Sequence, residues 1–236
     1  MGRQDMWPRK VFKDRKDAGH RLAEALERFK GQDPVVLALP RGGVPVGLEV
    51  ARALGAPLDV LLVRKIGVPG QEELALGAIV DGEHPTFVLN ENVAAMVGPS
   101  PAYVEAEKKR QLAEIERRKR LYRGDREAVD IRGRTVIVVD DGIATGATMK
   151  AALRGVRQAQ PKRLVLAVPV APREALAEFR NESDEVVCLE TPEPFHAVGL
   201  HYADFGQTSD EDVVALLAAA RGTNEADAKT GDPPGQ

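Results

Sequence analysis

Short apolar runs alternate with amphipathic segments along most of the 236-residue chain. Apolar side chains in residues 17–29 recur every three or four positions, as on one face of a helix, whereas residues 35–39 and 135–139 are nearly continuous apolar runs typical of buried strands. The same criteria predict further helices at residues 44–54, 101–123, from 149 onward, 174–180 and 210–220, and further strands at residues 58–63, 74–80, 86–89, 163–168 and 185–189. Strands that alternate with helices indicate an α/β fold, in which a doubly wound parallel sheet carries helices on both faces.

Two segments interrupt this alternation. Residues 67–73 contain two glycines and a proline, which predict a mobile loop, and an Asp81–Gly82 turn should join the two strands that follow. Residues 91–130 are a long insertion dominated by the predicted helix at 101–123. Lys and Arg side chains on that helix alternate with Glu at helix-neighbour spacing, which indicates a solvated, salt-bridged face rather than a nucleic-acid patch.

Composition narrows the class of protein. With 43% hydrophobic content, residues 1–222 can bury the core of a single domain, and the polar residues 223–236 should form a disordered tail. The formal charge of −3 gives no global reason to expect nucleic-acid binding. The single cysteine, Cys188, cannot form an internal disulfide and falls in a predicted strand, so we expect a buried thiol. No apolar run approaches the ~20 residues of a membrane span and the N-terminus lacks the apolar core of a signal peptide, so we expect a cytoplasmic protein without a membrane partner.

The segment from residue 135 to residue 148 carries the most specific chemistry. Its strand ends at the adjacent carboxylates Asp140 and Asp141, a loop of small residues follows, and a helix begins near residue 149. The free N–H groups and the dipole of a helix N-terminus favour a phosphate at this loop. The residues expected around the phosphate are Gly142, Ala144, Thr145, Gly146, Ala147 and Thr148. The two carboxylates would repel a phosphate, so vicinal ribose hydroxyls, or a magnesium ion attached to them, are their expected partners.

Simpler or competing motifs explain this segment less well. An ordinary strand-ending turn accounts for Asp141 and Gly142 but not for the second carboxylate or the two threonines. A Walker loop needs a lysine where Ala147 stands. A dinucleotide fingerprint needs a glycine spacing that Gly42, Gly43 and the glycine four residues later do not have. The pattern therefore favours a sugar phosphate.

Residues 136–148 resemble the motif with which type I phosphoribosyltransferases bind 5-phosphoribosyl-1-pyrophosphate (PRPP): four apolar residues, two acidic residues and a Gly/Thr loop. The resemblance implies that Asp140 and Asp141 hold the ribose 2′- and 3′-hydroxyls, and a metal ion through those hydroxyls or through water, while the loop wraps the 5′-phosphate. The resemblance in overall layout spans roughly residues 15–220. It extends to bacterial members of the family that have the same Arg-Gly-Gly and Arg-Lys-Ile-Gly blocks, and it does not identify the acceptors of those proteins. The implied fold is the family's parallel core with a small hood, here with a long helical insertion.

Basic residues follow the first two core strands. Arg41, Gly42 and Gly43 come directly after the first strand, and adjacent glycines let the backbone approach an anion and offer it N–H donors. Arg64 and Lys65 end the next strand, at the edge where parallel sheets bind ligands. By resemblance these five residues contact the pyrophosphate of PRPP. The simpler alternatives are a tight turn for the first block and a surface ion pair for the second.

Two further parts of the family's site are less regular in this chain. Residues 67–73 correspond to the flexible loop that closes over PRPP, but they are few and acidic and lack the basic residue often found there. The hood that selects the acceptor is expected at residues 191–207, where Phe195 would stack on a base and Val198 and Tyr202 would line the acceptor site. The alternative is that the aromatic side chains of this segment pack the last helix onto the sheet.

These features predict Mg²⁺-dependent transfer of the 5-phosphoribosyl group from PRPP to a nitrogen nucleophile, with a purine-like base as the first candidate and pyrophosphate as the leaving group. The expected catalytic residues are Asp140, Asp141, Arg64 and Lys65, which would act by positioning and electrostatics. A PRPP-binding regulatory protein without turnover and a PRPP hydrolase stay open as alternatives. The expected partners are PRPP and a small-molecule acceptor, and a homodimer stays open.

Overall fold

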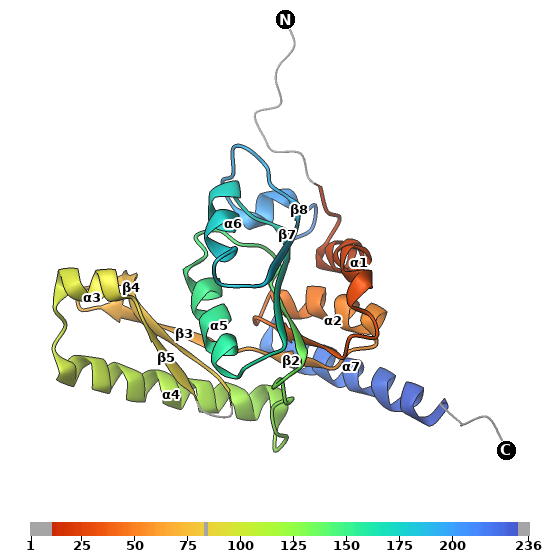
Figure 1. Ribbon diagram of the computed structural model, residues 1–236, viewed down its shortest axis with the longest axis horizontal. Helices are drawn as coiled ribbons and strands as arrows, with labels where there is room; N and C mark the ends of the chain where they lie inside the picture. The colour runs from red at the N-terminus through yellow and green to blue at the C-terminus, as the bar shows by residue number, and fades with distance from the viewer. Residues whose placement is uncertain (1–10, 83–84, 231–236) are drawn as a thin grey trace, which may run out of the picture.

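The computed structural model describes residues 11–82 and 85–230, and its centre is a five-stranded sheet (Figure 1). The strands are β1 (Pro34–Ala38), β2 (Leu58–Val60), β6 (Thr135–Val139), β7 (Arg163–Val170) and β8 (Glu185–Glu190). They lie in the order β2-β1-β6-β7-β8, and every neighbouring pair is parallel. Every residue of β1 and β6 is buried, as their apolar runs predicted, because both faces of the sheet are covered.

Helices cover the two faces. Figure 1 shows α1 (Arg15–Leu26), α2 (Gly43–Leu54) and α7 (Asp210–Thr230) on one side of the sheet and α5 (Ala147–Gln158) and α6 (Arg173–Phe179) on the other. Two short 3-10 helices, η1 (Glu27–Phe29) and η2 (Val198–His201), complete this part of the chain. The predicted doubly wound α/β fold is confirmed. Within the residues described, we find no helix that combines the length and the apolar character needed to cross a membrane.

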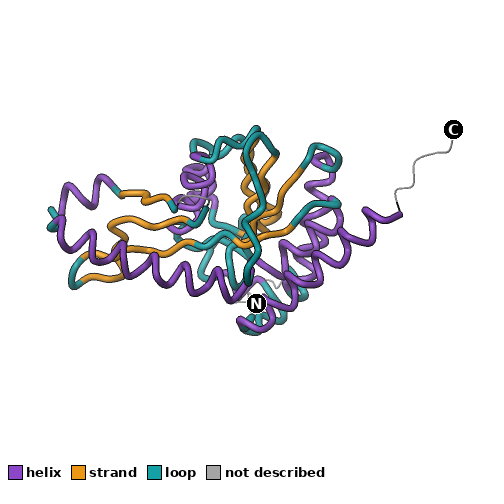
Figure 2. Tube along the Cα trace, turned by 90° about the horizontal axis from the view of Figure 1, so that it is seen from below, coloured by secondary structure: helices purple, strands orange, loops and turns teal. Residues whose placement is uncertain are grey.

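A second unit, which we call the arm, projects from one side of this core (Figures 1 and 2). It contains β3 (Val63–Val68), β4 (Gln71–Val80) and β5 (Thr86–Leu89), paired as an antiparallel sheet, and α3 (Glu91–Val97) and α4 (Pro101–Arg123). The long helix α4 packs on one face of the small sheet, with Ile115 in the same buried cluster as Ile66 and Leu76. Helix α5 lies against β4, since a Cβ atom on Gly155 would come 2.5 Å from a methyl carbon of Val80. The arm is therefore packed against the core at its root.

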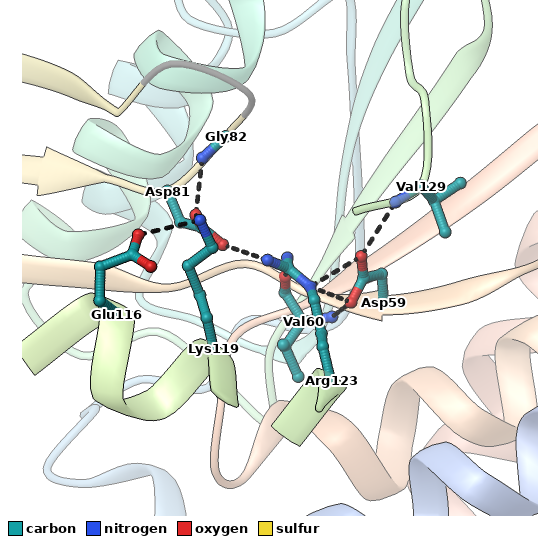
Figure 3. A network of polar contacts seen from close by, with 8 residues as sticks. All are labelled: Asp59, Val60, Asp81, Gly82, Glu116, Lys119, Arg123 and Val129. Atoms are coloured by element: carbon teal, nitrogen blue, oxygen red, sulfur yellow. Dashed lines mark hydrogen bonds and ion pairs between the residues drawn. The ribbon is translucent and has the colours of Figure 1, made fainter. Parts of the chain in front are cut away.

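A buried ionic network ties the root of the arm to the central sheet (Figure 3). The guanidinium of Arg123, at the end of α4, donates to both carboxylate oxygens of Asp59 at 2.8 and 3.1 Å and to Asp81 at 2.7 Å. It also donates to the carbonyl of Val60 at 2.7 Å, and Lys119 lies 3.6 Å from Asp81. Arg123 is only 5% exposed, so its charge depends on these partners rather than on water. The network joins β2, the residue that follows β4, and α4 at one point.

The structure corrects three expectations from the sequence. The strand predicted at 58–63 is divided, because β2 ends at Val60 in the central sheet and β3 begins at Val63 in the arm. The mobile loop predicted at 67–73 is a β-hairpin, in which Val68 pairs with Gln71 around a turn at Gly70 that has a φ of 74°. Helix α7 runs ten residues past 220, so residues 223–230 are helical where a disordered tail was expected; residues 231–236 lie outside the described part of the chain.

Candidate functional site

The two carboxylates of the motif lie at the carboxyl end of β6. The backbone N–H of Asp141 donates to Oδ1 of Asp140 at 2.8 Å, which closes the chain tightly after Val139. The carboxylate of Asp141 accepts a hydrogen bond at 2.8 Å from Nε of Arg15, at the start of α1, and the two side chains are 14% and 12% exposed. Sequence reasoning missed Arg15, which is 126 residues away along the chain and belongs to no motif. Asp141 is therefore ion-paired with Arg15. Both acidic residues lie at the carboxyl end of the parallel strands, where α/β folds bind ligands.

Burial dominates the electrostatics of this pair. Loss of solvation raises the pKa of Asp140 well above its ordinary value, and the neighbouring charge of Asp141 raises it further. Loss of solvation also raises the pKa of Asp141, while the positive charge of Arg15 and its hydrogen bond act in the opposite direction. Two adjacent, half-buried carboxylates repel each other, so the site favours a cation or a set of hydrogen-bond donors beside them.

The Arg41-Gly-Gly block lies directly against the acidic pair. β1 and β6 are neighbours in the sheet, so the loops after them leave the same edge. A Cβ atom on Gly42 would overlap Oδ2 of Asp141, and one on Gly43 would come 2.8 Å from the carbonyl oxygen of Val139. Only glycine leaves room for this approach. The loop expected to bind pyrophosphate and the carboxylates expected to bind ribose are thus in contact.

The phosphate loop follows the acidic pair and ends at the N-terminus of α5. Gly142 packs against hydrophobic side chains, since a Cβ atom there would come 2.6 Å from Cγ1 of Val198. Gly146 caps α5 with a φ of 78°, in the left-handed region that favours glycine. The residues that face solvent around it, and so can meet a ligand, are Ala144, Thr145, Ala147 and Thr148. The predicted loop therefore has an open edge at a helix N-terminus.

Arg64 and Lys65 lie in the arm and point to opposite faces of β3, as neighbouring strand residues do. Nε of Arg64 donates to the side chain of Gln111 on α4 at 3.0 Å. Lys65 instead lines a cleft of about 430 Å³ between the arm and α5, where Thr148 of the phosphate loop also lies. The expectation that both cations converge with Arg41 on one pyrophosphate is not met for Arg64, whose guanidinium is engaged on the α4 side.

The segment expected to form the hood packs over the acidic loop. Tyr202 is 2% exposed, and its hydroxyl donates to the backbone carbonyl of Asp141 at 2.5 Å. Its ring contacts Phe12 at a centroid distance of 5.3 Å, in a small buried cluster with Phe195 and Val198 at its edge. Tyr202 therefore supports the backbone of the acidic loop, which differs from its expected contact with an acceptor. Phe195 and Val198 are only partly buried and stay compatible with one.

The residues of the site fit a magnesium ion that is bound together with a phosphorylated ligand. Within the described ranges, no group of three or more His, Cys, Asp or Glu side chains is placed to hold a metal ion. At the end of β6, the described residues offer the two carboxylates of Asp140 and Asp141. Magnesium commonly binds through one or two carboxylates together with substrate phosphates and water, so this donor set fits an ion that arrives with a phosphorylated ligand.

Comparisons with known proteins point to one family. The family model described as "Phosphoribosyl transferase domain" matches residues 12–204. Two proteins from strains of Mycobacterium tuberculosis, both named "Putative phosphoribosyl transferase", are 51% identical over 211 residues, which cover 89% of this chain and 47% of theirs. The chain thus spans about half the length of these relatives. The crystal structure of TT1426 from Thermus thermophilus is similar with a TM-score of 0.79 and 48% identity, over 89% of this chain and 98% of that one.

Proposed function

The chain belongs to the phosphoribosyl transferase family, and on that premise we propose that it transfers a 5-phosphoribosyl group from PRPP to a nitrogen nucleophile. The observation that carries the proposal is the meeting of two loops, because Gly42 after β1 touches the carboxylate of Asp141 after β6. PRPP bears a pyrophosphate on one side of its ribose and a 5′-phosphate on the other. A ligand of that shape needs both loops at once.

Each part of the site has a role in this reaction. A bond from the acceptor nitrogen to ribose C1′ forms while the bond from C1′ to the pyrophosphate oxygen breaks, and the N–H proton of the acceptor passes to the departing pyrophosphate or to water. Asp140 and Asp141 hold the ribose hydroxyls, and residues 144–148 bind the 5′-phosphate through backbone amides and threonine hydroxyls. Residues 41–43, with Lys65, bind the pyrophosphate. Arg64 is assigned to the arm, because its guanidinium binds Gln111.

The rate enhancement comes from positioning and electrostatics rather than from a protein nucleophile. Positive charge develops on the ribose as pyrophosphate leaves, and the carboxylates of Asp140 and Asp141 stabilise it. When bound with PRPP, magnesium supplies charge neutralisation for the departing pyrophosphate. The partly buried Phe195 and Val198 are the side chains available for a purine-like base, which would place the reaction in nucleotide metabolism.

A pyrophosphate-release assay tests the proposal. The protein is mixed with Mg²⁺, PRPP and each member of a panel of purine and pyrimidine bases, and pyrophosphate and nucleotide are measured together. Release of pyrophosphate that requires one base, with the matching nucleotide formed, is the expected result. The matched control is Asp140→Asn with Asp141→Asn, which keeps the shape of both side chains and should lose the activity.

Other outcomes of the same assay identify the alternatives. Equal pyrophosphate release with and without every base would mean PRPP hydrolysis. PRPP binding in calorimetry without pyrophosphate release would mean a PRPP-binding protein without turnover. A wild-type chain that binds no PRPP in the presence of Mg²⁺ would contradict all three.

A further inference from the structure

Arg15 is held by groups from two distant parts of the chain. Its Nε donates to Oδ2 of Asp141 at 2.8 Å, and its Nη1 donates to the carbonyl oxygen of Gly206 at 2.6 Å. The guanidinium carbon lies 3.9 Å from the centroid of the Phe205 ring. A planar guanidinium can stack and donate in its own plane at the same time, and a lysine ammonium cannot. The side chain therefore bridges the end of β6 and the segment that follows η2.

The backbone around Arg15 is fixed by the same segment. Asp14 caps α1, since its side chain accepts from the N–H of Asp17 at 2.8 Å. The N–H of Asp204 donates to the carbonyl of Lys13 at 2.8 Å, two residues before Arg15. The segment that leads into α1 is thus attached to residues 203–206. Arg15 is held in place by its main chain as well as by its side chain.

We propose that Arg15 is a positioning residue for ribose binding, which fixes the carboxylate of Asp141 and joins it to Phe205 and Gly206. The inference rests on the proposed function, because it assigns ribose hydroxyls to Asp141. Those hydroxyls are neutral, so the ribose itself brings no charge that could replace the Arg15 cation beside the two carboxylates. Arg15 is also held by the carbonyl of Gly206 and the ring of Phe205, so we expect it to stay in place when PRPP and Mg²⁺ bind. The opposite arrangement, in which Arg15 blocks the carboxylate and must leave, predicts tighter binding once the side chain is removed.

The test compares ligands that share the ribose. Arg15→Ala should weaken binding of both PRPP and ribose 5-phosphate by roughly tenfold or more, the scale of one lost charge-assisted hydrogen bond. Added guanidinium ion, well below denaturing concentration, should restore part of the affinity by occupying the space left by the side chain. Arg15→Lys should bind less tightly than wild type, because an ammonium cannot stack on Phe205 while it binds Asp141 and Gly206.

Arg21 provides a matched control on the same helix. It also stacks on an aromatic ring, 4.7 Å from the centroid of Phe12, and pairs with Glu190 at 3.3 Å. Arg21→Ala removes a similar side chain from α1 without touching Asp141. It should leave both ligand affinities at the wild-type value, and guanidinium should have no effect on it. Thermal unfolding of each variant shows that the compared proteins are folded.

The outcomes separate the inference from the proposed function. Wild-type protein that binds no PRPP overturns both. If the wild-type protein binds PRPP and the Arg15→Ala variant binds it equally or more tightly, the inference alone is overturned. The inference is also overturned if folded Arg15→Ala loses affinity and added guanidinium does not restore it. If Arg15→Ala does not fold, Arg15→Lys decides, because wild-type affinity in that variant shows that a positive charge is sufficient and the bridging geometry has no role.

Discussion

The backbone of Gly42 lies so close to Asp141 that a Cβ atom there would overlap the carboxylate oxygen Oδ2. The two residues are about a hundred positions apart in sequence and meet because β1 and β6 pair in parallel, Ala38 opposite Val139. The carboxylate cannot simply turn away, because Oδ2 is hydrogen-bonded to Arg15. The contact explains why a glycine stands at this position and joins the two halves of the proposed PRPP site.

Gly42→Ala should therefore impair ligand binding more than folding. The added methyl group displaces either the Asp141 carboxylate or the pyrophosphate loop, so we expect PRPP affinity to fall at least about tenfold, or ~1.4 kcal/mol. Calorimetric titration with PRPP and Mg²⁺ measures the affinity, and circular dichroism confirms the fold. Wild-type affinity in the variant would show that the two loops separate freely and that their contact is not part of the site.

The placement of the two arm cations predicts different results for adjacent residues. Lys65→Ala should weaken binding of PRPP more than that of ribose 5-phosphate, which lacks the pyrophosphate, by roughly 1.5–3 kcal/mol. Arg64→Ala should change neither affinity, because its guanidinium binds Gln111 on the α4 side. Lys109→Ala on the exposed face of α4 is the control. Equal losses for both ligands in Lys65→Ala would place Lys65 at the 5′-phosphate or in a structural role.

The sequence predicted the parts of the site that are local. The strand, the acidic pair, the small-residue loop and the helix start of residues 135–148 follow one another, so their pattern is sufficient to locate them, and β6 and α5 confirm it. The neighbouring Arg41-Gly-Gly loop followed from strand order. Strand alternation alone would have placed Arg64 and Lys65 on opposite faces of their strand.

Other features depend on tertiary contacts that no local pattern records. Arg15 precedes the helix predicted at residues 17–29, whereas α1 begins at Arg15, and only the approach of its side chain to the end of β6 makes it a partner of Asp141. Tyr202 reads as an aromatic ring of the hood, but its hydroxyl is directed to a backbone carbonyl by burial against Phe12. The hairpin at 67–73 was hidden by its glycines and proline, which are equally common in loops and in tight strand turns.

Cys188 should be an unreactive thiol at neutral pH. Burial raises its pKa from 9.0 to about 11, so the thiolate is scarce below that pH. Labelling of the native protein by a maleimide should be slow at pH 7.5 and rise ~10-fold per pH unit toward pH 11. The raised pKa also means that the unfolded chain loses the thiol proton first, so this group costs stability as pH rises from 9 to 11. Native labelling as fast as in denatured protein would contradict the prediction.

We expect the buried charge of Arg123 to hold the root of the arm against the central sheet. Arg123→Met keeps most of the side-chain volume but leaves Asp59 and Asp81 buried without the cation that they share, and we expect a loss of about 3–5 kcal/mol in the free energy of unfolding. The matched control is Arg117→Met on the same helix, whose exposed pairing with Glu114 should contribute much less to the free energy of unfolding. Urea denaturation measures the free energy of unfolding of both variants.

Because Lys65 is carried by the arm, a folded Arg123→Met protein should also lose affinity for PRPP while it keeps its affinity for ribose 5-phosphate. Similar stabilities for the two variants would mean that hydrophobic packing of α4, rather than the buried ionic network, holds the arm against the core.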